Sequence, residues 1–238
     1  MSPAFCASPR PSGTSSSWPV AWAGTPPRTS RTASSPRRRN LGPRRNPVTD
    51  PDATRPERVL SSRRLYEGRI LNLRVDTVEL PGGGEATREI VEHAEVAATV
   101  PLDDDGTVTL VRQYRLAVGQ ALLEVPAGLV HPGEPLLEAA RRELEEETGL
   151  RAARLRHLVS FYVSPGFTDE RVHLFLAQGL SQGHPQNAAD ERIQVVRLPL
   201  RQALALVERG DVQDAKSVIG LLLAARETGL IVERRGTD

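Results

Sequence analysis

The chain has very little of several residue types, and each scarcity excludes a class of protein. Its 238 residues include one cysteine, Cys6, which excludes a disulfide framework and a cysteine-based zinc site. No apolar run reaches the length of a membrane span, and the one at residues 18–23 is too short and too interrupted for a signal peptide. We therefore expect a soluble protein of the cytoplasm that has no membrane partner.

Lysine is almost absent, and the charge is divided unequally along the chain. Lys216 is the one lysine among 31 basic residues, so 31 − 1 = 30 are arginines, an imbalance typical of GC-rich coding. Residues 1–47 carry eight arginines and no acid, for a charge of +8. Residues 48–238 carry the remaining 23 bases and all 30 acids, for a charge of −7. The two segments together give the net charge of +1. The average therefore hides two physically different segments.

The N-terminal segment is rich in Arg, Pro and Ser and has no helical or strand period, so we expect residues 1–57 to be disordered. Its basic clusters, such as residues 37–39, would suit nucleic acid or an anionic membrane. Its composition also suits a transit peptide. We prefer a third interpretation, in which translation begins near Val48 and the tail is not part of the protein. No nucleic-acid partner is then expected.

The rest of the chain predicts an α+β fold with a mixed sheet. Alternating apolar residues, with turns at Gly68 and at the glycines of residues 82–84, predict a small antiparallel sheet over residues 58–93. We expect residues 94–232 to form the main domain, with strands over 95–102, 107–115, 121–126, 154–163, 172–178 and 193–198. Helices are expected over residues 134–148, 200–208 and 214–227, the first with Pro135 in its first turn and Gly149 at its end.

The helix over residues 134–148 has an unusual concentration of acids at its C-terminal end. Around a helix axis, Glu143 and Glu147 lie about 40° apart, and Glu146 lies about 60° to the other side. Like charges at this spacing weaken a helix, and the negative end of its dipole favours cations. The three carboxylates therefore indicate a site for a bound cation, and hard oxygen ligands suit Mg²⁺ or Mn²⁺.

The segment from Gly128 to Leu150 resembles the signature of the Nudix hydrolases, Gly-x5-Glu-x7-Arg-Glu-U-x-Glu-Glu-x-Gly-U with U aliphatic. All nine constrained positions match, and they are Gly128, Glu134, Arg142, Glu143, Leu144, Glu146, Glu147, Gly149 and Leu150. The resemblance implies an α/β/α sandwich around a mixed sheet. It also implies metal-dependent hydrolysis of a diphosphate linked to another group, with two or three Mg²⁺ or Mn²⁺ ions per site.

The resemblance also implies a role for each residue of this motif. Glu143 and Glu147 would be the main metal ligands, and Glu147 and Arg142 would also be catalytic residues. Glu146 and the carbonyl of Ala127 would complete the metal shell. Arg142 would pair with Glu134 to brace the loop against the helix. Gly128 would give the backbone the freedom to turn the Ala127 carbonyl towards the metal.

Two further segments resemble the ADP-ribose pyrophosphatase branch of the family. The first is Gln113-Tyr114-Arg115 followed by Leu-Glu-Val-Pro-Ala-Gly at residues 123–128. The second is the segment at residues 164–170, in which Pro165 lies 16 residues after Gly149. By this resemblance Glu170 is the candidate general base, with Asp169 as its nearest rival. Arg115 would contact a phosphate, and weaker candidates for phosphate or ribose contacts are Arg69 and Arg88.

The resemblance implies a homodimer in which the strands at residues 58–93 help to build the partner's site. The leading hypothesis is hydrolysis of ADP-ribose to AMP and ribose 5-phosphate. A second hypothesis is hydrolysis of another nucleotide sugar, such as GDP-mannose or ADP-glucose. A third is a regulator that senses ADP-ribose without cleaving it. Within residues 58–93 only Tyr66 offers an aromatic ring for adenine, which leaves the choice of nucleotide open.

Overall fold

The computed structural model describes residues 55–184 and 192–231. The expectations for the N-terminal tail therefore lie outside the described residues, apart from residues 55–57, which belong to no helix or strand. Within the described ranges no helix is both long and apolar enough to cross a membrane.

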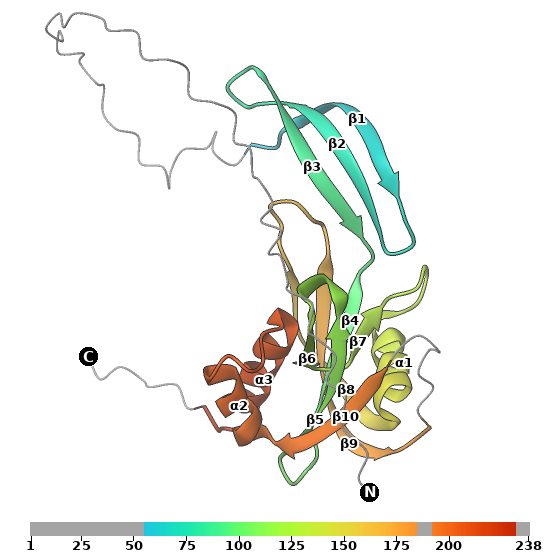
Figure 1. The fold of residues 1–238 in the computed structure, drawn as a ribbon, viewed down its shortest axis with the longest axis vertical. Helices are drawn as coiled ribbons and strands as arrows, with labels where there is room; N and C mark the ends of the chain where they lie inside the picture. The colour runs from blue at the N-terminus through green and yellow to red at the C-terminus, as the bar shows by residue number, and fades with distance from the viewer. Residues whose placement is uncertain (1–54, 185–191, 232–238) are drawn as a thin grey trace, which may run out of the picture. The chain divides into compact units, whose positions relative to one another are not determined.

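The small N-terminal sheet is present and antiparallel, as predicted. It consists of β1 (Arg58–Glu67), β2 (Leu71–Glu79) and β3 (Glu85–His93), in the order β1-β2-β3 (Figure 1). The turn between β1 and β2 is closed by the N–H of Gly68, which donates to the carbonyl of Leu71 at 3.1 Å. Every residue of β1 is exposed.

Two further sheets build the main domain. The four-stranded sheet contains β4 (Val96–Pro101), β7 (Ala127–Leu129), β8 (Leu150–Tyr162) and β9 (Arg171–Gln182), in the order β7-β4-β9-β8. It is mixed, because β4 and β9 are parallel and the other pairs antiparallel. The three-stranded sheet has the order β10-β5-β6, from β5 (Thr107–Arg115), β6 (Gln120–Glu124) and β10 (Ile193–Pro199).

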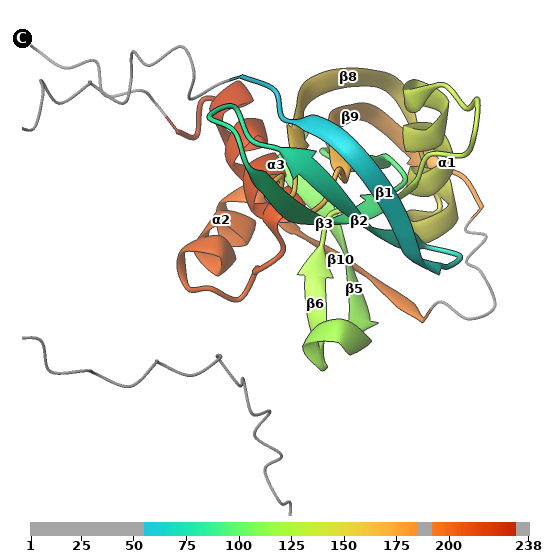
Figure 2. The same cartoon turned by 90° about the horizontal axis from the view of Figure 1, so that it is seen from above.

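Helices cover both faces of the four-stranded sheet, and its inner strand β4 is therefore buried throughout. Ala97 packs with Ala139 and Ala140 of α1 (Leu136–Thr148). The next residue, Ala98, points to the opposite face and belongs to the cluster of Leu221 on α3 (Ala215–Glu227). The remaining helix is α2 (Leu200–Glu208). Figures 1 and 2 show α1 and α3 on opposite sides of the sheet, which confirms the predicted α/β/α sandwich.

The structure corrects two of the predicted elements and adds a third. Helix α1 begins at Leu136, and Pro135 is its extended N-cap with a ψ of 137° instead of a first-turn residue. The strand expected over residues 121–126 ends at Glu124, because the chain there leaves one sheet and enters the other as β7. A short 3-10 helix, η2 (Leu116–Val118), lies between β5 and β6 and was not predicted.

Candidate active site

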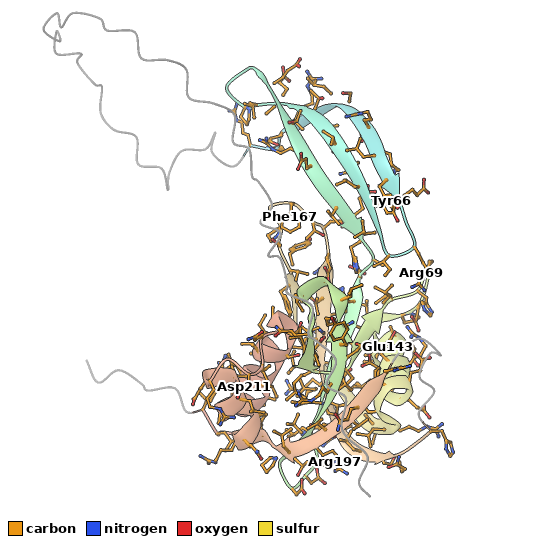
Figure 3. All side chains as sticks on the ribbon, in the orientation of Figure 1. Tyr66, Arg69, Glu143, Phe167, Arg197 and Asp211 are labelled. Carbon is orange, nitrogen blue, oxygen red and sulfur yellow. The ribbon has the colours of Figure 1, made fainter. Side chains whose placement is uncertain are left out.

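A cavity of about 990 Å³ is lined by residues of both sheets of the main domain, of α1, of the start of α3 and of the β1–β2 turn. Its charged lining residues are Arg69, Arg115, Glu124, Arg142, Glu143, Glu146, Glu170, Asp214 and Lys216. Figure 3 labels Glu143 on α1 beside the central strands and Arg69 at the turn after β1. The volume is at the upper end of the range usual for small-molecule sites. Most of the charged residues proposed from the sequence are therefore gathered around one space.

The acidic end of α1 is held against β7 by Glu147. This side chain is only 6% exposed, and its Oε2 accepts a hydrogen bond from the N–H of Ala127 at 3.0 Å. Glu147 itself is not among the residues that line the cavity, whereas Ala127 is. A buried carboxylate that accepts a backbone N–H is a fixed feature, because removing either partner leaves a polar group unsatisfied. The bond therefore fixes the position of Ala127 relative to the glutamates.

Gly128 makes room for Glu143. A Cβ atom on this glycine would lie 2.1 Å from Cδ of Glu143 and 2.2 Å from each of its carboxylate oxygens. The backbone of Gly128 is not among the positive-φ positions of the described residues. The expected reason for the glycine, conformational freedom to turn the Ala127 carbonyl, is therefore not required. The glycine is needed because a carboxylate occupies the space of its side chain.

Arg142 ties the loop before α1 to the acids of the helix. Its Nε and Nη2 donate to the two oxygens of Glu134 at 2.8 and 2.9 Å, so the expected pair is formed. Its Nη1 donates to Glu143 at 2.6 Å and to Glu146 at 3.1 Å, and its Nη2 also reaches the carbonyl of Leu129 at 2.9 Å. The hydrogen bonds from Arg142 lower the pKa of Glu134 to about 2, so this ion pair persists at any physiological pH.

The donor set suits a hard divalent cation. Glu143, Glu146 and the backbone of Ala127 all line the cavity, and each offers oxygen atoms. Within the described ranges no three acidic or histidine side chains converge closely enough to hold a metal ion. The Nη1 group of Arg142 contacts both Glu143 and Glu146, so positive charge already lies between these carboxylates. These residues fit a metal, because Arg142 donates to one oxygen of each glutamate, Oε1 of Glu143 and Oε2 of Glu146, and each carboxylate has a second oxygen.

The loop at residues 163–170 carries both candidate bases and places their side chains differently. Glu170 lines the cavity. The carboxylate of Asp169 instead accepts a hydrogen bond from the N–H of His93 at 2.9 Å. The N–H of Val91 donates to the carbonyl of Phe167 at 2.8 Å, so this loop is joined to the end of β3. Asp169 thus anchors the loop, and Glu170 is the carboxylate that it presents to the cavity.

Pro165 follows the start of this loop, where the carbonyl of Ser164 accepts the N–H groups of Phe167 and Thr168 at 3.1 Å each. Proline suits the second position of such a turn because its φ is already fixed there. Gly149 ends α1 with a φ of 68°, which confirms the predicted C-terminal stop. Both residues therefore shape the chain at the two sides of β8.

The three arginines proposed as substrate contacts have different positions. Arg69 and Arg115 line the cavity. Arg88 of β3 does not line it, and it forms an ion pair with Glu57, which directly precedes β1. Arg115 donates from Nε and Nη2 to the carboxylate of Glu124 at 2.8 and 2.9 Å. Hydrogen bonding to Glu124 raises the pKa of Arg115, which keeps it charged.

Sequence reasoning missed a second charged cluster in the same cavity. Glu124 on β6 and Asp214 and Lys216 at the start of α3 all line it. Asp214 caps α3 by accepting the N–H of Ser217 at 3.0 Å. The Asp-x-x-Ser pattern and the isolated lysine were visible signals, but nothing local in the sequence links them to Glu124, which is 92 residues from Lys216.

Comparison with known proteins agrees with this geometry. Residues 91–219 match the NUDIX domain, and residues 57–91 match the nucleoside diphosphate sugar hydrolase N-terminal domain. The first match alone spans more than half of the chain. The chain belongs to the Nudix family. It is a Nudix hydrolase of the nucleotide-sugar type, and its small N-terminal sheet coincides with the second matched region.

Two relatives of this Nudix hydrolase are named for different substrates. It is 39% identical over 167 residues to an ADP-ribose pyrophosphatase of Bacillus subtilis (strain 168), covering 69% of this chain and 90% of that relative. It is 42% identical over 125 residues to a GDP-mannose pyrophosphatase of Citrobacter koseri (strain ATCC BAA-895 / CDC 4225-83 / SGSC4696), covering 48% of this chain and 63% of that relative.

A solved structure described as an ADP compounds hydrolase has the same fold, with a TM-score of 0.67 and 26% sequence identity. The match covers 74% of this Nudix hydrolase and 98% of that chain. It therefore includes nearly all of the other protein.

Proposed function

We propose that this Nudix hydrolase cleaves ADP-ribose to AMP and ribose 5-phosphate and depends on Mg²⁺ or Mn²⁺. The observation that carries the proposal is the cavity in which Glu143 and Glu146 of α1, Arg115 of β5 and Glu170 of the loop after β8 share one space. Acids for metal ions, a cation for a phosphate and a carboxylate for a water are the groups that diphosphate hydrolysis needs. The similarity to the Bacillus subtilis ADP-ribose pyrophosphatase, along 90% of its length, favours ADP-ribose.

Glu143, Glu146, Glu147 and the carbonyl of Ala127 would hold the metal ions, two or three per site. When bound, such ions neutralise phosphate charge and make a water more acidic. Arg142 keeps Glu143 and Glu146 on the cavity side of α1 through its hydrogen bonds at 2.6 and 3.1 Å. Its own position is fixed by Glu134, which uses both carboxylate oxygens for the purpose. We assign Arg142 to holding the ligands in place.

Glu170 is the proposed general base, and Arg115 the proposed phosphate contact. Among the contacts of the described residues, none engages the carboxylate of Glu170 in a hydrogen bond or ion pair, although its backbone is bonded to Val163 and Thr168. A carboxylate that is not engaged in a hydrogen bond or ion pair within the protein can accept a proton from a water. Arg115, held by Glu124, presents a rigid guanidinium at the cavity wall, which suits a phosphate oxygen.

Glu170→Gln is expected to lower kcat about a hundredfold or more, because an amide cannot accept the proton of the water. Metal affinity should change little, since Glu170 is not among the proposed ligands. Single-turnover rates together with Mn²⁺ titrations monitored by electron paramagnetic resonance measure the two effects separately. Asp169→Asn is the matched comparison, because that carboxylate is bonded to the N–H of His93. An unchanged kcat in the Glu170 variant would move the base role to another residue.

The substrate itself is tested by a panel of ADP-ribose, ADP-glucose and GDP-mannose with Mg²⁺, assayed for released nucleotide and sugar phosphate. We expect ADP-ribose to have the highest kcat/KM. The GDP-mannose pyrophosphatase relative makes GDP-mannose the second candidate, but the match includes only 63% of that protein. A tenfold preference for GDP-mannose would refute the assignment to ADP-ribose.

We also propose that the enzyme is a cytoplasmic homodimer whose N-terminal sheets complete each other's sites. Support comes from apolar side chains exposed on and beside β1, namely Val59 (55%), Leu65 (47%), Tyr66 (58%) and Ile70 (52%). Such a surface is costly to leave in water. Arg88, which lies away from the cavity of its own chain, would then be able to serve the partner's site. Light scattering measures the subunit number, and a monomer at micromolar concentration would overturn this proposal.

A further inference from the structure

The second charged cluster of the cavity is centred on the one lysine of an arginine-rich chain. The Nζ atom of Lys216 lies 2.6 Å from Oε2 of Glu124 and 2.9 Å from Oδ1 of Asp214. The side chain is 14% exposed and lines the cavity. An ammonium group has three N–H donors, and these two contacts use two of them. One donor therefore remains for a molecule in the cavity.

Glu124 fixes this lysine and Arg115 together. The carboxylate is 2% exposed, accepts both Nε and Nη2 of Arg115, and accepts Nζ of Lys216. Burial tends to raise the pKa of Glu124, but the hydrogen bonds from Arg115 and the charge of Lys216 outweigh it, so the pKa is lowered. A cluster held on three elements, β5, β6 and α3, is preorganised.

Stability alone does not explain the cluster. Burying charged groups contributes little to stability, because desolvation offsets much of their attraction. Arg115 already neutralises Glu124 through two hydrogen bonds, so the fold does not require a second cation there. The lysine nevertheless stands where the cavity wall meets the start of α3, next to the capping residue Asp214. A role in ligand binding explains the position of Lys216 better than a role in stability does.

The cluster differs chemically from the acidic end of α1. Arg115 and Lys216 balance Glu124 and Asp214, so the four side chains carry no net charge and present donors beside acceptors. A sugar hydroxyl both donates and accepts, and this mixture matches it better than it matches a phosphate. The four side chains also include no aromatic or large apolar group against which a base would stack. The cluster therefore fits a polyol.

We propose that Lys216 and Asp214 form the subsite for the hydroxyl groups of the sugar that is not part of the nucleoside, with Lys216 as its specificity-determining residue. The inference rests on the proposed function, in which Arg115 contacts a phosphate. Arg115 and Lys216 share the carboxylate of Glu124. A phosphate on Arg115 therefore brings the attached sugar next to Lys216. The ribose of the nucleoside has the same chemistry, and the experiment separates the two sources.

The test compares inhibition of ADP-ribose hydrolysis by ribose 5-phosphate and by AMP in the wild type and in Lys216→Met, which retains the aliphatic stem. We expect the inhibition constant of ribose 5-phosphate to rise about tenfold or more, a loss of about 1.4 kcal/mol. That of AMP should stay within about twofold, a change below about 0.5 kcal/mol. The matched control is Arg156→Met, which removes a cation paired with Glu227 of α3 at 2.6 Å but not lining the cavity. It should change neither constant.

Three results would overturn the proposal: equal weakening of both products, weakening of AMP alone, or no change in either. If Lys216→Met unfolds, Lys216→Arg replaces it, because a guanidinium keeps the charge but not the compact ammonium and should also weaken ribose 5-phosphate selectively. Calorimetric titration of ribose 5-phosphate and AMP into each protein gives the same comparison without turnover. Failure of ADP-ribose hydrolysis is thereby distinguished from failure of the subsite.

Discussion

Glu147→Gln is expected to lower kcat by about a thousandfold, a rise of about 4 kcal/mol in the activation barrier, without unfolding the protein. The substitution removes a charge from the proposed metal ligands but keeps the shape of the side chain. The amide oxygen can still accept the N–H of Ala127, which Glu147 accepts at 3.0 Å. Relief of the repulsion between Glu143 and Glu147 adds a few tenths of a kcal/mol to helix stability. The melting temperature should therefore stay the same or rise slightly.

Steady-state kinetics over a range of Mg²⁺ concentrations, together with thermal unfolding, measure both effects. Glu138→Gln is the matched control, because Glu138 belongs to the same helix, is 60% exposed and does not line the cavity. It should leave kcat unchanged. Near-normal activity of Glu147→Gln would remove Glu147 from the metal site. Loss of activity together with a large fall in melting temperature would instead assign Glu147 to the fold, through its bond to β7.

The parts of the structure that the sequence predicts well are those encoded by neighbouring residues. Helix α1 ends where expected because Gly149 adopts a left-handed φ of 68° that few other residues accept. The pairing of Arg142 with Glu134, which the family resemblance implies, joins residues only eight apart in the chain. Strand β5 occupies the residues that the sequence predicts for it, because its buried run and its turn at 103–106 are both local.

The parts that could not be predicted depend on contacts between distant segments. The break between β6 and β7 is stabilised by the N–H of Val125, which donates to Oγ of Ser217 at 2.8 Å from 92 residues away. The cluster of Glu124 with Lys216 has the same separation. The spacing of apolar residues along the chain carries no information about such a pair. The sequence therefore predicts a strand that continues through residues 125–126, and it gives no sign of the charged wall of the cavity.

At Gly128 the sequence suggests one physical reason for a glycine and the structure shows another. A glycine serves either where φ is positive or where another group approaches the backbone closely, and a sequence does not distinguish the two. In the structure the close approach decides, because the carboxylate of Glu143 fills the place of a side chain. The two reasons predict different consequences for Gly128→Ala. A strained φ would destabilise the fold, whereas a displaced carboxylate would damage the site.

Gly128→Ala is accordingly expected to lower kcat/KM by about a hundredfold, or about 2.7 kcal/mol, while stability changes by about 1 kcal/mol or less. The new methyl group would overlap atoms at 2.1–2.2 Å, but those atoms are the far end of a flexible side chain, which can swing away. Glu143 would then leave the position from which it would hold a metal ion. Kinetics, Mn²⁺ affinity and thermal unfolding of the variant measure these effects. Gly82→Ala is the control, since a Cβ there meets nothing within 4 Å and its φ is not positive. A variant at Gly128 that keeps normal activity would show that hydrolysis does not depend on the position of Glu143.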